Sequence, residues 1–312
     1  MPMNEFELID FLTAGLSTNS ALVKGPGDDC AVLDLGLPDR WVLFKTDAVV
    51  EGIHFRPDAE PERIGHKAMA RCLSDIAAMS GVAVSAVVTL ALPANFDPER
   101  IRRIYAGMDR LAARHGVAIS GGETTSNPER LLISVAVMGT VEKARCIFRS
   151  GAKVGDAIFV SGELGGSLVS RHLDFEPRVK EGRWVTEHFA INSMMDVSDG
   201  LAGDLRHILT ASGVGAELMS SSIPISRAAR LRSRGESSAK SPLLAALTDG
   251  EDFELVFTVA SKDAVRVLDG WKQSFPETRL TCVGRITDKP GLRLHDGQKI
   301  IEFKGAGFTH FS

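Results

Sequence analysis

The sequence predicts a two-domain protein in which α-helices and β-strands are mixed. Its length of 312 residues is about twice that of an average domain. In the first half, short apolar segments of strand length alternate with amphipathic segments of helix length. A second series of such segments starts after Arg149-Ser150-Gly151. We therefore expect a first domain over residues 1–149 and a second over residues 150–312, in a fold of the α/β (α+β) class.

Composition and charge narrow the range of functions. Lys and Arg total 36 and Asp and Glu total 40, a net charge of −4, whereas nucleic-acid-binding surfaces carry a basic excess. No apolar run reaches the roughly 18 residues of a membrane-spanning helix. Residues 1–16 hold acids but no Lys or Arg, unlike a signal peptide. The four cysteines form no CxxC pair, which favours reduced thiols. We expect a cytoplasmic protein that binds neither nucleic acid nor membranes.

Three helices and three strands are expected in the first half. The helices cover Asn4–Leu16, Pro61–Met79 and Asp97–His115. Asn4 and Asp97 are suited to cap the first and the third helix, because their side chains accept hydrogen bonds from free backbone N–H groups. The strands cover Trp41–Lys45, Val84–Leu92 and Leu131–Val141, and the first is expected to end at Thr46-Asp47.

The second half is expected to be built in the same way. Strands are predicted over Ala157–Ser161, Glu254–Val259 and Leu280–Ile286, and a helix is predicted to start within Ser167–Leu173. A further helix carries Leu201, Leu205 and Ile208 on one face. The segment Ser226–Ser241 is rich in Arg, Ser and Ala, and we interpret it as a solvated connection.

Acidic residues recur beside glycines or at the ends of apolar strands. Glycine lets the backbone approach a ligand closely, and a carboxylate at a strand end faces the sheet edge, where sites are commonly built. So many acids cannot converge without cations, and all-oxygen ligands favour Mg²⁺. The segments are Gly27-Asp28-Asp29, Thr46-Asp47, Gly122-Glu123, Asp196-Val197-Ser198-Asp199-Gly200 and Gly250-Glu251-Asp252, with Asp75 from the helix after Pro61.

Each of these features also has a purely structural interpretation. Asp-Gly and Gly-Asp pairs are common in turns, and Asp199 is equally suited to cap the helix that follows it. Asp75 has the spacing for an exposed ion pair with Lys67 or Arg71. A lone His54 is most simply a packed or surface histidine. The glycine-rich segments match neither the P-loop nor the Rossmann fingerprint. Several acids nevertheless occupy the same kind of position, beside a glycine or at the end of an apolar strand, and their number favours a metal site.

The same segments, taken in order, resemble the thiamine-monophosphate kinases, a family of the AIR-synthase-like (PurM-like) superfamily. The resemblance covers nearly the whole chain, from about residue 24 to the C-terminus. Each motif alone is modest, but the ordered set is highly specific. The matching segments are Gly27 to Val32, Thr46 to Phe55, Ser74 to Met79, Gly121 to Thr125, Arg149 to Asp156, Ser161 to Ser167, Met195 to Leu201, Gly250 to Phe257 and Gly307 to Phe311.

The resemblance implies an N-terminal sheet-and-helix domain that forms a barrel with its twin across a homodimer, and a C-terminal mixed sheet covered by helices. It implies an enzyme that uses several Mg²⁺ ions to move the γ-phosphoryl group of ATP onto thiamine monophosphate, giving thiamine diphosphate and ADP. We expect direct in-line transfer, because the motifs place no side chain as an obligate phosphoryl acceptor. No general base is required, because the attacking phosphate oxygen is already ionised. The alternatives are another ATP-dependent superfamily member, such as an aminoimidazole ribonucleotide synthetase, and a catalytically inactive nucleotide-binding homologue.

Matched motif by motif, the resemblance also assigns roles to single residues. The implied Mg²⁺ ligands are Asp29, Thr46, Asp47, Asp75, Glu123, Asp196 and Asp199, of which Asp29, Asp47, Asp75 and Asp199 are also the implied catalytic residues. The implied ATP contacts are Gly121, Gly122, Arg149 and Ser198. The implied contacts to the thiamine substrate are His54, Glu251 and Phe308.

The chain departs from the family pattern at three places. Glu123 stands where the family usually has Asp, and Asp249-Gly250 stands where it usually has Gly-Gly. Lys45 stands where a small residue such as Ser is usual. We expect Glu123 to remain a metal ligand, because a water or the adjacent glycines absorb one extra methylene. Lys45 argues against a metal contact through its side chain but leaves its carbonyl oxygen as a ligand. Asp249 is expected to alter only a loop.

Overall fold

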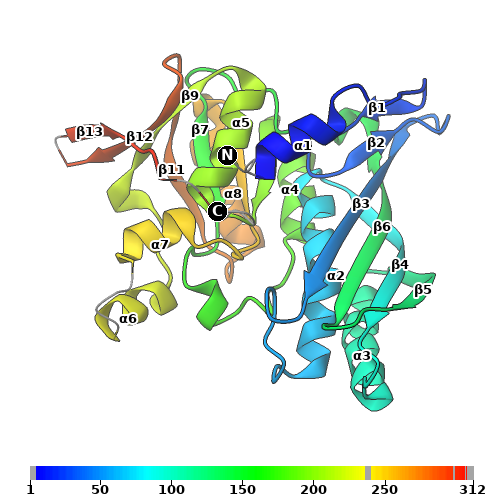
Figure 1. Ribbon diagram of the computed structural model, residues 1–312. Helices are drawn as coiled ribbons and strands as arrows, with labels where there is room; N and C mark the ends of the chain where they lie inside the picture. The colour runs from blue at the N-terminus through cyan, green and yellow to red at the C-terminus, as the bar shows by residue number, and fades with distance from the viewer. Residues whose placement is uncertain (1–4, 236–239, 298, 306, 308–312) are drawn as a thin grey trace.

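The computed structural model describes residues 5–235, 240–297, 299–305 and 307. Two β-sheets lie side by side, each with its own helices (Figure 1). The short helix α1 (Glu5–Thr13) precedes the first sheet. The predicted cap Asn4 and the predicted substrate contact Phe308 lie outside the described residues. In the described part of the chain, no helix combines the length and apolar character needed to cross a bilayer.

The first sheet has the strand order β1-β2-β3-β6-β4-β5. Its strands are β1 (Leu22–Lys24), β2 (Ala31–Leu33), β3 (Arg40–Val50), β4 (Val82–Leu92), β5 (Ala118–Ser126) and β6 (Leu132–Glu142). Neighbouring strands are antiparallel except for β4 and β5, which are parallel. Helices α2 (Pro61–Ala78) and α3 (Pro98–Arg114) cover one face (Figure 1). Alternate residues of the strands point to these helices and form the first core.

Two glycines let α2 and α3 cross in close contact. A Cβ atom at Gly65 would lie 1.9 Å from the carbonyl oxygen of Ile104, and one at Gly107 would lie 1.9 Å from the carbonyl oxygen of Glu62. Only the absence of both side chains lets the two helix backbones approach so closely. This contact fixes α2, whose last turn carries Asp75.

The second sheet has the strand order β13-β12-β9-β11-β7-β10-β8, with only β9 and β12 parallel. Its strands are β7 (Ala157–Ser161), β8 (Ile191–Val197), β9 (Gly215–Met219), β10 (Glu254–Val259), β11 (Leu280–Thr287), β12 (Gly291–Asp296) and β13 (Lys299–Glu302). Both of its faces are covered by helices. Helices α4 (Val179–His188) and α8 (Ala264–Ser274) pack on one face, and α5 (Leu201–Ser212) and α7 (Pro242–Thr248) pack on the other.

The first sheet, in contrast, leaves apolar side chains exposed on the face away from α2 and α3. Phe44, Val87 and Met138 lie on β3, β4 and β6 and are each more than 40% exposed. Phe44 and Met138 face each other directly across the β3–β6 pair. Contiguous exposed apolar side chains in the middle of a sheet are typical of an interface.

Each sheet with its own helices forms one structural unit, and helix α2 packs against both units. Ala78 at its end packs into the core of the second unit together with Phe257 and Trp271. Gly182 of α4 lies against the same helix, since a Cβ atom there would be 2.5 Å from the carbonyl oxygen of Ala77. The last turn of α2 is therefore held between the two sheets.

Most predicted elements are confirmed to within a few residues, but three predictions are wrong. Strand β3 continues past Thr46-Asp47 to Val50, because it pairs with β6 along its whole length. Ser167–Leu173 holds only the 3₁₀ turn η2 (Ser167–Val169). The segment Ser226–Ser241 contains helix α6 (Arg227–Gly235), which packs beside α7. The expected cap of α3 is confirmed, since Asp97 accepts a hydrogen bond from the N–H of Glu99.

We expect Gly107→Ala to lower the free energy of unfolding by about 2 kcal/mol or more, although alanine favours a helix by about 1 kcal/mol over glycine. The added methyl group would collide with the backbone of α2. Urea denaturation measures the change. Ala106→Ser, on the exposed side of the same turn, should change stability by no more than about 0.5 kcal/mol. Unchanged stability in Gly107→Ala would contradict the close crossing.

Candidate active site

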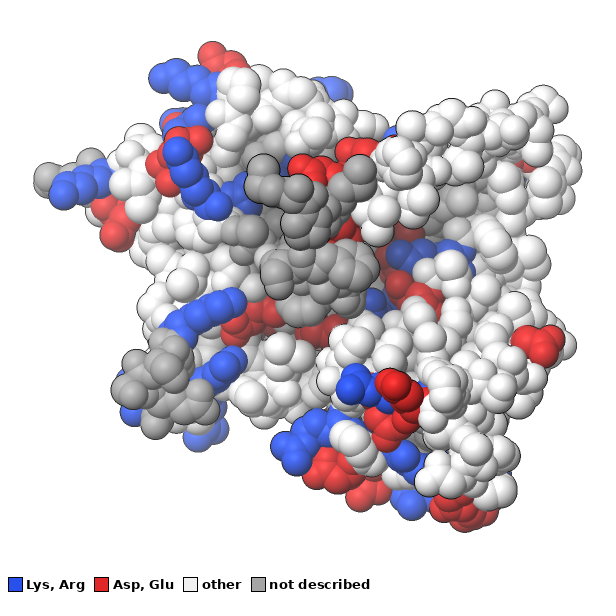
Figure 2. Space-filling model, viewed as in Figure 1, with Lys and Arg blue, Asp and Glu red and all other residues white. Residues whose placement is uncertain are grey.

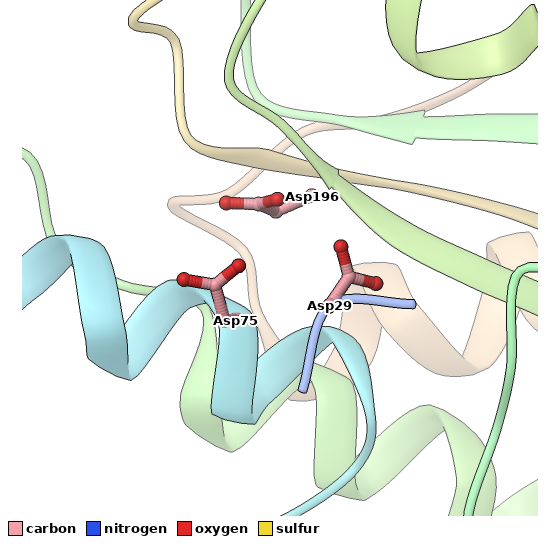
Figure 3. A group of neighbouring side chains, drawn as sticks. All are labelled: Asp29, Asp75 and Asp196. Atoms are coloured by element: carbon pink, nitrogen blue, oxygen red, sulfur yellow. The ribbon is translucent and has the colours of Figure 1, made fainter. Parts of the chain in front are cut away.

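Three buried aspartates converge where the two units meet. Asp29 precedes β2, Asp75 lies in the last turn of α2, and Asp196 lies in β8. Each is at most 6% exposed. One carboxylate oxygen of each lies within 4.8 Å of the others, and the side chains point into the same space (Figure 3). We call these three residues the aspartate group. Two of its members come from the first half of the chain and one from the second.

Each carboxylate of the aspartate group has one oxygen held by a donor of the chain. The guanidinium of Arg149 donates to Asp29 Oδ1 at 2.7 Å, the hydroxyl of Ser74 donates to Asp196 Oδ2 at 2.5 Å, and Lys45 Nζ donates to Asp75 Oδ1 at 2.8 Å. The other oxygen of Asp29 is buried and has no hydrogen-bond partner among the described residues. A buried acceptor without a donor is costly and marks a place for a cation.

The electrostatics of the aspartate group also favour a cation. Burial, and next the negative charge of Asp29, raise the pKa of Asp196 to about 7. Burial raises the pKa of Asp75 well above its ordinary value, although Lys45 opposes the shift. Burial alone would lower the pKa of Lys45, but the charges of Asp75 and Asp47 outweigh it, so the amine stays protonated. Buried oxygen ligands at this spacing fit Mg²⁺, which accepts carboxylates and keeps waters.

A pocket opens beside the aspartate group. It is lined by Ile53, His54, Arg71, Leu168, Ser198, Asp199, Asp249 and Glu251. Four of these were predicted as site residues: His54, Ser198, Asp199 and Glu251. Strand β8 carries Asp196 into the aspartate group, and Ser198 follows two residues later in the pocket wall. The pocket and the group are therefore neighbours along one strand. Acidic and basic side chains gather in this region, at the junction of the two units (Figure 2).

Glu251 is held in the pocket wall by two basic residues of α2. Lys67 Nζ lies 2.5 Å and Arg71 Nη1 lies 3.2 Å from its carboxylate oxygens. Lys67 is fully buried and also donates to the carbonyl oxygen of His54 at 2.7 Å. Glu251 itself has a φ of +60°, which is unusual for a residue with a side chain. Its N–H donates to the carbonyl oxygen of Ser198 at 2.6 Å, which fixes this conformation.

A second buried ion-pair network supports the loop that carries Glu251. Glu254 is fully buried and pairs with Arg171 at 2.6 Å and Arg178 at 2.7 Å. Asp252 is 1% exposed and accepts a hydrogen bond from the N–H of Gly165 at 2.8 Å. Burial raises the pKa of Asp252 to about 7, although this hydrogen bond and Arg171 oppose the shift. The loop therefore rests on two carboxyl groups that the solvent hardly reaches, those of Asp252 and Glu254.

Asp47 and Thr46 lie on opposite faces of β3, because side chains alternate along a strand. Asp47 points inward, 3.9 Å from Lys45 Nζ and 3.8 Å from Arg71 Nη2. Burial would raise its pKa, but these two charges lower it below its ordinary value. Thr46 points outward, and its hydroxyl lies 3.2 Å from the hydroxyl of Ser134. The Thr46 side chain is thus directed away from the aspartate group.

Gly121, Gly122 and Glu123 also lie away from the aspartate group. They belong to β5, which forms the edge of the first sheet and is three strands away from β3. All three residues are exposed. A Cβ atom at Gly122 would lie 1.8 Å from the carbonyl oxygen of Val88, so this glycine is required by the β4–β5 pairing. Within one chain these residues do not join the site.

Two structural alternatives for the predicted aspartates are wrong. Asp199 does not cap α5, because the cap position is Gly200 and no side chain bonds there. Instead, the N–H of Asp199 donates to Asp204 Oδ2 at 3.0 Å. Asp75 forms no exposed ion pair with Lys67 or Arg71, since it is buried and contacts Lys45. Asp249, expected to affect only a loop, pairs with Lys240 at 2.9 Å and lines the pocket.

Sequence reasoning missed several functional neighbours. Asp204 is 1% exposed, and burial followed by the charge of Asp199 raises its pKa. Asp28 accepts a hydrogen bond from the N–H of Arg149 at 3.0 Å, while burial raises its pKa to about 6. Lys67 is a fully buried lysine in the middle of a helix. The Gly-Asp-Asp motif pointed to Asp28, but nothing in the sequence indicated that Asp204 or Lys67 would be buried.

Comparisons with known proteins identify the class. The family model described as the N-terminal domain of AIR synthase related proteins matches residues 27–141, and the model of their C-terminal domain matches residues 153–297. Both matches are in the order that the sequence motifs predicted. The boundary between residues 149 and 150 stays a prediction.

Among curated relatives, thiamine-monophosphate kinase of Rhodopirellula baltica is 41% identical over 86% of this chain and 84% of its own length. That of Bacillus subtilis is 34% identical over 99% of this chain and its whole length. The solved structure of AaThiL complexed with AMPPCP and TMP is 29% identical and covers 100% of this chain and 99% of its own, with a TM-score of 0.83. The chain belongs to the thiamine-monophosphate kinase family, which confirms the predicted resemblance and the two-domain α/β fold.

We expect the Asp252 carboxyl to make stability depend on pH. In the folded chain it holds its proton up to about pH 7, whereas an unfolded aspartate releases it near pH 4. The folded state therefore binds more protons in this window, and the free energy of unfolding falls as the pH rises, by at most about 1.4 kcal/mol per unit. Asp252→Asn keeps the acceptor for Gly165 and should flatten the pH dependence between pH 5 and 7.

Urea denaturation at pH 5, 6 and 7 measures this dependence in the parent and in the variant. The matched control is Asp269→Asn, on the exposed side of α8, which should keep the slope of the parent. Equal slopes in all three proteins would show that Asp252 titrates normally.

Proposed function

We propose that the chain is a Mg²⁺-dependent thiamine-phosphate kinase that transfers the γ-phosphoryl group of ATP directly to thiamine monophosphate, giving thiamine diphosphate and ADP. The observation that carries the proposal is the buried aspartate group with its unpaired oxygen. Two anionic phosphates repel each other, and a site that joins them must supply positive charge. The curated thiamine-monophosphate kinases that match over most of their length, and the AMPPCP and TMP bound to the solved neighbour, support the same activity.

In this proposal the aspartate group holds Mg²⁺ together with Asp47 and Asp199. When bound, Mg²⁺ neutralises the charge of the reacting phosphates. Arg149 holds Asp29 in place, and its buried Nε atom has no partner among the described residues, so we infer that it also faces the ATP phosphates. Ser198 contributes to the same side of the site from the end of β8.

The pocket next to the aspartate group suits the thiamine substrate. Ile53 and Leu168 offer apolar surface to the rings, and Glu251 contributes a polar side chain to the same wall. His54 also lines the pocket. Its ring is held in place by a hydrogen bond that its Nδ1 accepts from the N–H of Val50 at 3.0 Å. The acceptor phosphate is already ionised, so these residues need only to bind and orient it. Phe308 is retained as a proposed substrate contact.

We expect parent protein to form ADP from ATP and Mg²⁺ only when thiamine monophosphate is added, and γ-labelled ATP alone should leave the protein unlabelled. Asp75→Asn should lower kcat/KM at least about a hundredfold, because a site that neutralises phosphate charge loses one carboxylate. The control Asp174→Asn removes an exposed ion pair with Arg63 and should keep activity within about twofold.

If the protein became labelled and passed the label on to the product, the reaction would proceed through a phospho-enzyme and not by direct transfer. ADP formation without any effect of thiamine monophosphate would overturn the proposed substrate. Full activity of Asp75→Asn at saturating Mg²⁺ would show that the aspartate group is not needed for the reaction.

We further propose a homodimer that uses the exposed apolar face of the first sheet. Phe44, Val87 and Met138 on that face are exposed, and no helix of the described residues covers them. We infer that Glu123 and its two glycines, which are exposed on the edge strand β5 and lie away from the site of their own chain, serve the site of the second copy. A cytoplasmic location belongs to the same proposal, since the four cysteines are free thiols and a reducing compartment keeps them so.

We expect the parent to sediment as a dimer and Met138→Asp to sediment as a monomer, because a buried, unpaired charge would weaken the interface. The matched control Val265→Asp changes an equally apolar, 68% exposed residue on α8 and should stay dimeric. Analytical ultracentrifugation measures the mass of each. A parent protein that is monomeric at all concentrations would contradict the interface.

A further inference from the structure

Lys45 occupies an unusual position for a lysine. Alternation along β3 turns Lys45 and Asp47 to the inner face of the sheet, toward the last turn of α2, which carries Asp75. The Lys45 side chain is 23% exposed, so most of its length is packed between the sheet and the helix. Its ammonium group ends among carboxylates rather than in solvent.

The ammonium group lies between two carboxylates. Without it, both carboxylates would be available as metal ligands in the proposed site. Its nitrogen is 2.8 Å from Asp75 Oδ1 and 3.9 Å from Asp47 Oδ1. A divalent cation between the same two carboxylates would take oxygen ligands from them at a shorter distance, about 2.1 Å for Mg²⁺, so the ammonium group and a metal ion would compete for the same oxygens. Of the other basic groups nearby, Arg149 binds Asp29, whereas Arg71 binds Glu251 and also lies 3.8 Å from Asp47 Oδ1. The contact with Asp75 is made by Lys45.

We propose that Lys45 is a resident cation of the site: its ammonium group takes the place of one divalent cation between Asp47 and Asp75, and the remaining oxygens of the aspartate group bind metal. This inference rests on the proposed magnesium-dependent function. It makes Lys45 a positioning residue, because it holds Asp75 in one orientation and neutralises one charge permanently. Lysine carries one charge on a tethered arm, so this part of the site stays neutralised when metal is scarce.

The number of bound metal ions tests the proposal without any substrate. Mn²⁺, which shares the oxygen-ligand preference of Mg²⁺, is counted by electron paramagnetic resonance during a titration with Mn²⁺ alone. Lys45→Ser removes the ammonium group and opens the space, so it should bind one Mn²⁺ per chain more than the parent. Lys45→Met fills the same space without charge and should gain no ion. The control Lys180→Met, exposed on α4, should match the parent.

An equal number of Mn²⁺ ions in Lys45→Ser and in the parent would overturn the proposal. If Lys45→Ser is too unstable to titrate, its melting temperature is measured against Mn²⁺ concentration instead. The proposal then expects a larger rise in melting temperature for Lys45→Ser than for the parent, and an equal rise contradicts it. The count is independent of turnover, so a parent without kinase activity but with the expected counts would refute only the proposed function.

Discussion

The structure depends on keeping several buried carboxylates close together against their mutual repulsion. Burial and like charges both raise the pKa values of such groups, so a loosely held cluster would open or take up protons. Here the elements that carry the aspartates are anchored elsewhere. The glycine crossing with α3 fixes α2, pairing with β10 fixes β8, and Arg149 fixes the loop of Asp29. The carboxylates are therefore preorganised, and a cation gains their attraction without rearranging the chain.

The donors that the chain itself supplies explain how the fold tolerates this arrangement. Arg149, Ser74 and Lys45 each satisfy one oxygen of one aspartate. Ser74 comes from the first half of the chain and Asp196 from the second, so their contact also joins the two units. Each donor binds only one side of its carboxylate. These donors offset the repulsion between the remaining oxygens only in part. A doubly charged ion would neutralise more of this negative charge than any one of these side chains does.

The sequence predicted the elements that local patterns define, such as β10 and the Asp97 cap of α3. It also predicted that the acids would gather, but it did not predict which side chains face inward. Because β3 does not end at Thr46-Asp47, strand alternation turns Asp47 to the site and Thr46 away from it. The contact of Lys45 with Asp75 joins residues 30 positions apart. Such pairings follow from packing between elements, which no local pattern encodes.

The pocket and the aspartate group are connected through strand β8 and helix α2. Strand β8 leads from Asp196 directly to Ser198, and the carbonyl oxygen of Ser198 fixes the N–H of Glu251 at 2.6 Å. Glu251 holds a φ of +60°, a conformation that persists only where the surroundings impose it. The buried amine of Lys67 does so from α2, the helix that also carries Asp75. Asp75 and the lysine that holds Glu251 thus lie on the same helix, and this helix sets the position of the aspartate group relative to the pocket wall.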